Sequence, residues 1–197
     1  RENIADLVDE GSFLEYGQLL IAGQRTRRSL EDLRRNTPAD GLVSGYATVN
    51  AELVGEEAAQ CMVMAYDYTV LAGTQGVFNH KKMDRLLHLA QERARPLIIY
   101  AEGGGGRPGD VDYEPISVGG LDVMTFALFA KLSGRVPLIA IVNGYCFAGN
   151  AAIAGCADVI IATESASIGM GGPAMIEGGG LGQFHPREVG PVSVQAP

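Results

Sequence analysis

The stretch 136-VPLIAIVNGYCFAG-149 determines the fold that we expect for this chain. Its apolar run over 137–142 stops at Asn143-Gly144, and Gly149 precedes the helix-prone sequence AAIAG. This order predicts a buried strand, a tight turn and the start of a helix. Unpaired amides in such a turn, together with the first amides of a helix, can converge on an oxyanion or a phosphate. We therefore expect the chemistry of the chain at this turn.

A second junction between a strand and a glycine turn precedes this stretch. The apolar run Leu97–Tyr100 leads directly into AEGGGGRPGD, so four consecutive glycines, 103–106, follow the strand. A further buried strand is expected over 158–162. Strands that alternate with helices predict a parallel sheet with right-handed crossovers. Adjacent parallel strands would place both glycine turns at one edge of the sheet, where their amides can flank one carbonyl group.

The other segments predict the elements around this sheet. We expect a helix over 1–9, two adjacent strands within 41–50 and 58–73, and a loop followed by a helix within 73–96. The buried face of that helix should carry Met83, Leu86, Leu87 and Ala90. Another helix, over 121–133, should direct Met124, Ala127, Leu128 and Phe129 inward.

Length and composition describe a globular chain that is one domain or half of a larger one. It has 197 residues, of which 47% are hydrophobic and 19% are charged, so a sizeable core is expected. It starts at Arg1 without an initiator Met and ends in the apolar sequence VGPVSVQAP. From these ends we expect a single domain, 1–197, that is a half or fragment of a longer protein.

Charge and cysteine usage exclude several classes of function. A net charge of −8 argues against nucleic acid as a partner, and neither a membrane span nor a signal peptide is evident. Cys61, Cys146 and Cys156 are odd in number and fit free thiols in a reducing, cytoplasmic compartment. Neither they nor the scattered histidines have the spacing of metal ligands, so no metal site is expected.

Four segments of the chain stand in the same order as four signatures of one enzyme family. RENIADLVDEGSFLEYG resembles its opening helix and Gly-Ser-Phe-x-Glu turn, and DGLVSGYATVN with AYDYTVLAGTQG resembles its first strand pair and following Gly-rich segment. AEGGGGRPGD resembles its Asp-Ser-Gly-Gly-Ala-Arg turn, and NGYCFAGNAAIAGCADVIIA resembles its Gly-Pro-Cys-Ala-Gly-Gly turn. The chain thus resembles the N-terminal half of the carboxyltransferase (beta) component of biotin-dependent acyl-CoA carboxylases, in the crotonase superfamily.

This resemblance implies an α/β fold, the ββα spiral of the ClpP/crotonase type, and a reaction. The family transfers a carboxyl group from carboxybiotin to the α-carbon of an acyl-CoA, here expected to be acetyl- or propionyl-CoA. Its N-terminal half holds the thioester through two turn amides, which map onto Ala148 and Gly149. The biotin carbonyl is held in the C-terminal half. The implied partners are therefore acyl-CoA, that C-terminal half, a biotin carboxyl carrier and a biotin carboxylase, in a homo- or hetero-oligomer.

Further residues are candidates for binding the substrate. Gly104, Gly105, Gly106, Arg107 and Gly144 fall in the two turns. Arg107 matches the family's Arg, which either positions the loop or meets an anion. Lys81 and Lys82 stand at a helix start, which the helix dipole disfavours, so they suit either CoA phosphates or a solvated surface.

Both glycine turns depart from the family's pattern. Phe147-Ala148-Gly149-Asn150 stands where Ala-Gly-Gly-Ala is more common, and Glu102-Gly103 replaces Asp-Ser. An oxyanion donor is a backbone N–H, which the change from Gly to Ala preserves. The substitutions bear on the choice of substrate.

Three other interpretations stay open. The basic segment 23–36 is either a solvated surface or an arm that contacts an anion. The chain could be another crotonase-type enzyme, such as a hydratase, isomerase or decarboxylase, although a hydratase needs carboxylates over the acyl bond. It could also be a non-catalytic CoA-binding or assembly module.

Overall fold

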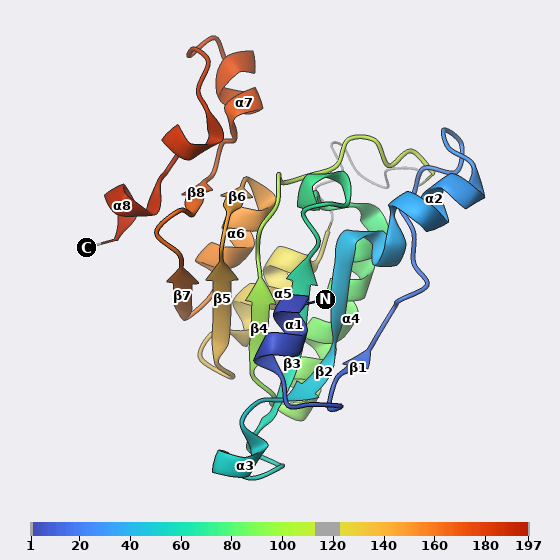
Figure 1. Ribbon diagram of the computed structural model, residues 1–197, viewed down its shortest axis with the longest axis vertical. Helices are drawn as coiled ribbons and strands as arrows, with labels where there is room; N and C mark the ends of the chain where they lie inside the picture. Colours follow the sequence, from blue (N-terminus) through green and yellow to red (C-terminus); the bar gives the residue numbers. More distant parts are fainter. Residues whose placement is uncertain (1, 113–122, 197) are drawn as a thin grey trace.

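The structure, a computed structural model, describes residues 2–112 and 123–196 and is built on a six-stranded sheet. The strand order is β1-β2-β3-β4-β5-β7, in which β1, β2 and β3 are antiparallel neighbours and β3, β4, β5 and β7 run parallel (Figure 1). The strands are β1 Leu14–Glu15, β2 Leu42–Thr48, β3 Gln60–Tyr66, β4 Leu97–Tyr100, β5 Leu138–Val142 and β7 Val159–Ala162. The predicted strand pair and parallel sheet are confirmed.

A second, two-stranded sheet stands at the end of β5. Strand β6, Tyr145–Phe147, pairs in parallel with β8, Ser167–Gly169. Strand β6 lies between the predicted turn at Asn143-Gly144 and the predicted helix, which is α6, Gly149–Gly155. The turn at Asn143-Gly144 therefore changes the direction of the chain from one sheet to the other.

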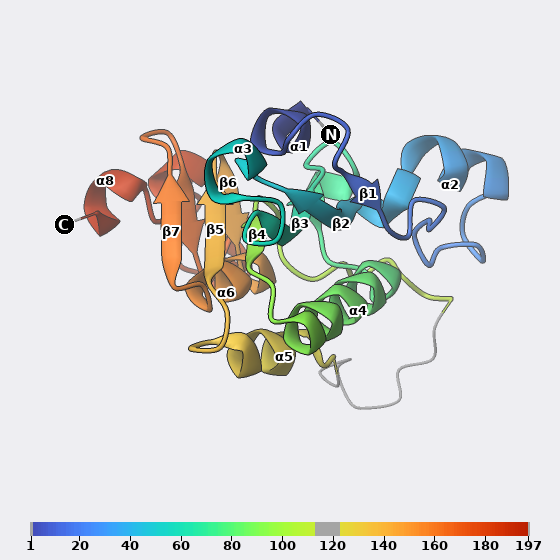
Figure 2. The ribbon, with the colours of Figure 1, turned by 90° about the horizontal axis from the view of Figure 1, so that it is seen from below.

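Helices cover both faces of the central sheet. Figure 2 shows α4, Val77–Arg93, and α5, Thr125–Leu132, on one face and α1, Glu2–Leu7, on the other. The remaining helical segments are α2 Leu30–Asn36, α3 Ala51–Val54, α7 Pro173–Gly178, α8 Val192–Gln195, and short 3-10 turns at Pro38–Gly41, Leu71–Gly73 and Pro186–Glu188. None of the helices in the described part of the chain is long and apolar enough to cross a membrane.

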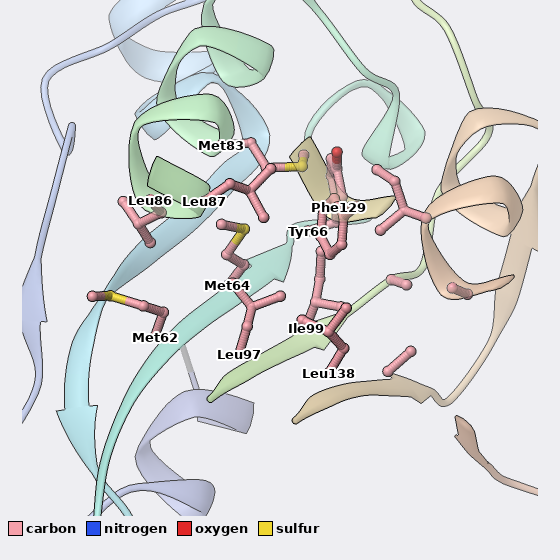
Figure 3. Packing of buried hydrophobic residues seen from close by; sticks show 14 of the residues in the cluster. Met62, Met64, Tyr66, Met83, Leu86, Leu87, Leu97, Ile99, Phe129 and Leu138 are labelled. Atoms are coloured by element: carbon pink, nitrogen blue, oxygen red, sulfur yellow. The ribbon is translucent and has the colours of Figure 1, made fainter. Parts of the chain in front are cut away.

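The main core lies between the sheet and helix α4. Met62 and Met64 of β3 and Leu97 of β4 point toward Met83 and Leu87 of α4 (Figure 3). The alternate residues of β3, such as Val63, pack in a second cluster with Ile4 of α1. Because side chains alternate across a strand, covering both faces buries every residue of β3 from 61 to 66 and explains its unbroken apolar run.

The expected inward face of the helix over 121–133 is partly wrong. Leu121 lies outside the described residues, and α5 begins at Thr125. Leu128 and Phe129 are buried as predicted, whereas Met124 and Ala127 are exposed. The buried residues of α5 are Thr125, Leu128, Phe129 and Leu132, a single stripe at i, i+3, i+4 and i+7. Met124 and Ala127 fall beside that stripe.

The expected burial of the strand over 158–162 is also wrong. β7 pairs with β5, but Val159, Ile160 and Ile161 are 51%, 44% and 55% exposed. The strand stands at the edge of the sheet, and the layers that cover the faces of β3 and β4 do not reach it. Beyond β8 the chain extends away from the sheet to α7 and then returns, so that Pro191, which precedes α8, forms an antiparallel bridge with Ser167 of β8 (Figure 1). Cys61 and Cys146 are buried free thiols, and Cys156 is a half-buried one.

Candidate functional site

The two predicted glycine turns meet at the carboxyl ends of β4 and β5. Gly103 forms a parallel bridge with Cys146. Its N–H donates to the carbonyl of Tyr145 at 2.8 Å, and its own carbonyl accepts from the N–H of Phe147 at 2.8 Å. The prediction that both turns lie at one sheet edge is confirmed.

The two amides of the expected oxyanion pair, Ala148 and Gly149, differ in their surroundings. The N–H of Ala148 donates to the carbonyl of Gly169 at 2.9 Å, which extends the pairing of β6 with β8. This amide therefore has a protein acceptor, and the expectation that it faces a ligand does not hold here. Gly149 is the first residue of α6, where an N–H has no acceptor within its own helix. A methyl group placed on Gly105 would lie 3.4 Å from the Gly149 nitrogen, so this nitrogen lies close to the other turn.

Ala148 holds an unusual backbone conformation. Its φ of 50° and ψ of −119° belong to a region that glycine occupies and that other residues rarely adopt. Its side chain faces Gly105, where a Cβ would stand 2.6 Å from that of Ala148. Gly105 itself has a φ of 88°. Glycine at 105 thus lets the two turns approach this closely.

Asn150, the second residue of α6, joins the turns and is fully buried. Its Oδ1 accepts from the N–H of Gly105 at 2.9 Å. Its Nδ2 donates to the carbonyls of Gly73 at 3.4 Å and Glu102 at 3.3 Å. The N–H of Gly104 in turn donates to Ala72 at 3.0 Å. Of the predicted substrate-binding glycines, Gly104 and Gly105 therefore have their amides engaged within the protein, as does Gly103, and Gly106 forms a parallel bridge with Gln75.

Arg107 positions the loop instead of meeting an external anion. Its side chain is 4% exposed, and its Nη1 lies 2.5 Å from Oδ1 of Asp40 and 3.4 Å from Oδ2 of Asp110. Nη2 donates to the carbonyl of Thr74 at 2.7 Å, and Nε donates to its hydroxyl at 3.1 Å. Of the two roles that the sequence allowed for Arg107, the structure supports the positioning one.

The two carboxylates that pair with Arg107 also hold the start of α4. The N–H of Asn79 donates to Asp40 at 2.8 Å, and that of Val77 donates to Asp110 at 3.2 Å. Negative charge at this end complements the helix dipole. Burial raises the pKa of Asp40, and the guanidinium of Arg107 opposes that shift.

Lys81 and Lys82 occupy different environments. Lys82 is 5% exposed, and its ammonium donates to the carbonyls of Gly17, Ala39 and Leu42. A buried ammonium with these acceptors does not reach a CoA phosphate, so that expectation is wrong for Lys82. Lys81 is exposed and its Nζ lies 5.8 Å from the centre of the Phe78 ring.

A cleft of about 740 Å³ opens beside the turns, at the carboxyl ends of β3, β4 and β5. Gly144 and Tyr145 line it, as do Tyr66 and Glu102. The Oε1 of Glu102 accepts from the N–H of Asn143 at 2.6 Å and so fixes the turn that follows β5. The acidic residues of the lining are Glu2, Asp67 and Glu102, and none of its residues within the described ranges is Lys or Arg. The cleft therefore suits an uncharged group better than a phosphate.

The basic segment 23–36 lies apart from this cleft. Arg25, Arg27, Arg34 and Arg35 are exposed, and Arg28 pairs with Asp32 on α2. No group of three His, Cys, Asp or Glu side chains that could hold a metal ion occurs in the described ranges.

The comparisons with known proteins agree with this geometry. A model of the carboxyl transferase domain matches residues 1–185, and the chain belongs to this family, whose N-terminal portion it covers. Its fold is the crotonase-like α/β fold.

Individual relatives include carboxylases of several kinds. The fold matches a structure of a single-chain, multi-domain long-chain acyl-CoA carboxylase with a TM-score of 0.93 and 63% identity, over 99% of this chain and 19% of that one. It matches the transcarboxylase 12S hexamer with a TM-score of 0.76 and 27% identity, over 99% of this chain and 35% of that one. The mitochondrial methylcrotonoyl-CoA carboxylase beta chain of Dictyostelium discoideum is 31% identical over 90% of this chain. The chain spans 28% of the length of that relative.

Sequence reasoning missed three residues that build the site. Asn150 is a polar residue in the otherwise apolar helix start GNAAIAG, and this contrast was the signal that could have revealed it. Asp40 precedes a strand and resembles an ordinary turn residue. Nothing in the sequence therefore identifies it as the partner of Arg107. Gln75 donates from Nε2 to the hydroxyl of Tyr66 at 3.2 Å, and its Oε1 lies 2.2 Å from the position that a Cβ on Gly149 would take.

Proposed function

We propose that this chain is the acyl-CoA-binding N-terminal domain of a biotin-dependent carboxyltransferase. The observation that carries the proposal is the Gly149 amide, which starts α6, lies close to the 103–106 turn and follows β6, whose first residue lines the cleft. The match to the carboxyl transferase domain supports it.

The chemistry follows from the charge that the reaction creates. Removal of an α-proton from a thioester leaves an enolate, and a preorganised N–H aimed at its oxygen stabilises that charge. Gly149 would supply this donor, strengthened by the partial positive charge of a helix start. Carboxybiotin would supply the carboxyl group. The amides that donate hydrogen bonds to the biotin carbonyl are expected in a C-terminal half. The neutral lining of Tyr66 and Tyr145 would seat the acyl or pantetheine portion, with the CoA phosphates outside the acidic cleft.

The acyl group has two candidates. The sequence led us to expect acetyl- or propionyl-CoA. A long-chain acyl-CoA is the second candidate, because the relative at 63% identity is a long-chain acyl-CoA carboxylase. We rank the long chain first on that identity.

The complete enzyme would require further components. We propose a carboxyltransferase C-terminal half, a biotin carboxyl carrier and a biotin carboxylase, either on the same polypeptide or as partners in a homo- or hetero-oligomer. The transcarboxylase 12S relative forms a hexamer, and the 63% relative is a single-chain, multi-domain protein, so both arrangements occur among relatives.

The test of this function removes the proposed hydrogen-bond donor, the backbone N–H of Gly149. Gly149→Pro removes the N–H at a helix position that tolerates proline, and Gly149→Ala is the matched control because it adds a Cβ but keeps the N–H. Both variants place a Cβ 2.2 Å from Oε1 of Gln75 and proline adds two further ring carbons, so each variant is first checked for the parent fold by circular dichroism. Ala148→Pro is unsuitable because proline fixes φ near −65° and Ala148 has a φ of 50°.

Calorimetric titrations with acetyl-, propionyl- and palmitoyl-CoA and with free CoA would give the result. We expect an acyl-CoA to bind the parent chain and the Ala variant, and to bind the Pro variant about tenfold more weakly, as for one oxyanion donor. Equal loss in both variants, or tighter binding of free CoA than of any acyl-CoA, would reject the proposed role of this amide.

A further inference from the structure

The side chain of Asn150 lies at the point where three separate loops meet. These loops are 71–75, the glycine turn 103–106 and the turn 144–149. Asn150 is fully buried, and both polar atoms of its carboxamide form hydrogen bonds. Its Oδ1 accepts from the N–H of Gly105, and its Nδ2 donates to the carbonyls of Gly73 and Glu102. It thus bonds to two loops from a helix that starts on the third.

The surrounding glycines are fitted to this carboxamide. A Cβ on Gly103 would lie 2.2 Å from Nδ2 of Asn150 and 2.2 Å from the carbonyl oxygen of Gly73. Gly105 lies against Ala148 in the same way, at 2.6 Å. Neither glycine can therefore carry a side chain without displacing its surroundings: Gly103 is limited by the Asn150 carboxamide and by Gly73, and Gly105 by Ala148. A polyglycine turn has much conformational freedom to lose, so an added tie to the helix has a large effect on its position.

We propose that Asn150 is a positioning residue that fixes the 103–106 turn against the start of α6 and so sets the width of the thioester site. The proposal rests on the proposed function, because the gap it fixes is the one between Gly105 and the Gly149 amide. The turn that Asn150 ties consists of four consecutive glycines, which have no side chains with which to fix their own position.

Two readouts separate positioning from a general contribution to stability. The first is the hydrogen-exchange rate of the Gly105 amide, followed by NMR. The second is the ratio of affinities for acyl-CoA and for free CoA, because only the acyl compound has a thioester oxygen to place. Both use the chain as it stands.

The chain offers a matched control for Asn150→Ala. Asn79 is also fully buried, and its Nδ2 donates to the carbonyls of Asp40 at 3.3 Å and Thr74 at 3.2 Å. Asn79→Ala should lower the Tm comparably without touching Gly105. We expect Asn150→Ala to speed exchange at Gly105 about tenfold or more and to weaken acyl-CoA binding about fivefold, with free CoA unchanged. Asn79→Ala should leave both readouts within about twofold.

A third variant keeps the test decisive if Asn150→Ala does not fold. Asn150→Asp retains an oxygen that can accept from Gly105, so we expect its Gly105 protection to exceed that of the Ala variant or to equal that of the parent chain. Unchanged Gly105 exchange in a folded Asn150→Ala chain, or loss of that protection in a folded Asp variant, would overturn the proposal. Faster exchange with an unchanged ratio of affinities would also overturn it. Failure of the parent chain to bind any acyl-CoA would instead reject the proposed function, while the exchange rates would still report on the tie.

Discussion

Arg107 and Asp40 form an ion pair that is closed off from solvent, with side chains 4% and 0% exposed and 2.5 Å between Nη1 and Oδ1. The pair connects the end of the glycine turn to the loop before β2. Arg107 also reaches Asp110, and both carboxylates accept amides at the start of α4. One guanidinium thus links the turn, the helix and the loop.

Removal of Arg107 should be strongly destabilising. Arg107→Met would leave Asp40 and Asp110 buried side by side without a cation, and loss of one partner of a buried pair costs ~3–5 kcal/mol. Urea unfolding measures this loss. The double variant Arg107→Met with Asp40→Asn removes one of the stranded charges and should recover part of it. A double variant less stable than Arg107→Met would contradict this account.

The neighbouring lysines should respond in opposite ways. Lys82→Met leaves the carbonyls of Ala39 and Leu42 without their buried donor and should lower the free energy of unfolding by ~2–4 kcal/mol. Lys81→Met, on the exposed side of the same turn of helix, should change stability by no more than ~0.5 kcal/mol. Chemical denaturation of the two variants side by side is the measurement. Equal effects would show that burial does not separate them.

The sequence predicted the framework of the site better than its contacts. The runs at 97–100 and 137–142 identify parallel strands, and their order places the two turns together, because adjacent parallel strands end at one edge. Periodicity alone could not show which amides in those turns have acceptors. The partner of Ala148 is Gly169, which is 21 residues later in the chain, and such pairings between distant segments leave no local signal.

Charged residues were misplaced for a related reason. Lys82 is polar in sequence, and a run of Lys-Lys at a helix start resembles a solvated or anion-binding surface. Its burial depends on the loops 17–18 and 39–42, which present carbonyl oxygens to it. Exposed β7 shows the converse, since Val159, Ile160 and Ile161 have the composition of a buried strand but lie at a sheet edge. Hydropathy reports what a residue would favour, and the surrounding layers decide whether it is covered.

Ala148 should tolerate replacement by glycine better than any other alanine of α6 or its cap. Its φ of 50° and ψ of −119° strain an L-residue by ~1–3 kcal/mol, which exceeds the ~0.5–1 kcal/mol that glycine loses in conformational entropy. Ala148→Gly should therefore raise the free energy of unfolding by ~1 kcal/mol. Ala152→Gly, within regular helix, is the matched control and should lower it by ~1 kcal/mol. Thermal and urea unfolding would measure both, and a stability loss in Ala148→Gly would count against the strain.

His80 should make the stability of the chain depend on pH in the mildly acidic range. The ring is 9% exposed, and its Nδ1 lies 2.8 Å from the hydroxyl of Thr125, which itself donates to Asp84. Burial, and then the charge of Arg107, lowers the pKa of His80 from 6.5 to about 4. Between these values the unfolded chain binds a proton that the folded chain does not. The contribution of His80 is therefore fully present above pH 6.5 and is lost progressively as the pH falls toward 4.

A neutral substitute isolates this contribution. His80→Gln cannot take up the proton, so the difference in unfolding free energy between the parent chain and the variant should change by on the order of 2 kcal/mol between pH 7.5 and pH 4.5. Carboxylates such as Asp84, whose pKa burial raises, titrate in both proteins and largely cancel in this difference. Urea unfolding at several pH values would give the two curves. Parallel curves would mean that His80 binds its proton equally well in the folded and unfolded chains, and that burial and the charge of Arg107 do not hold the ring neutral.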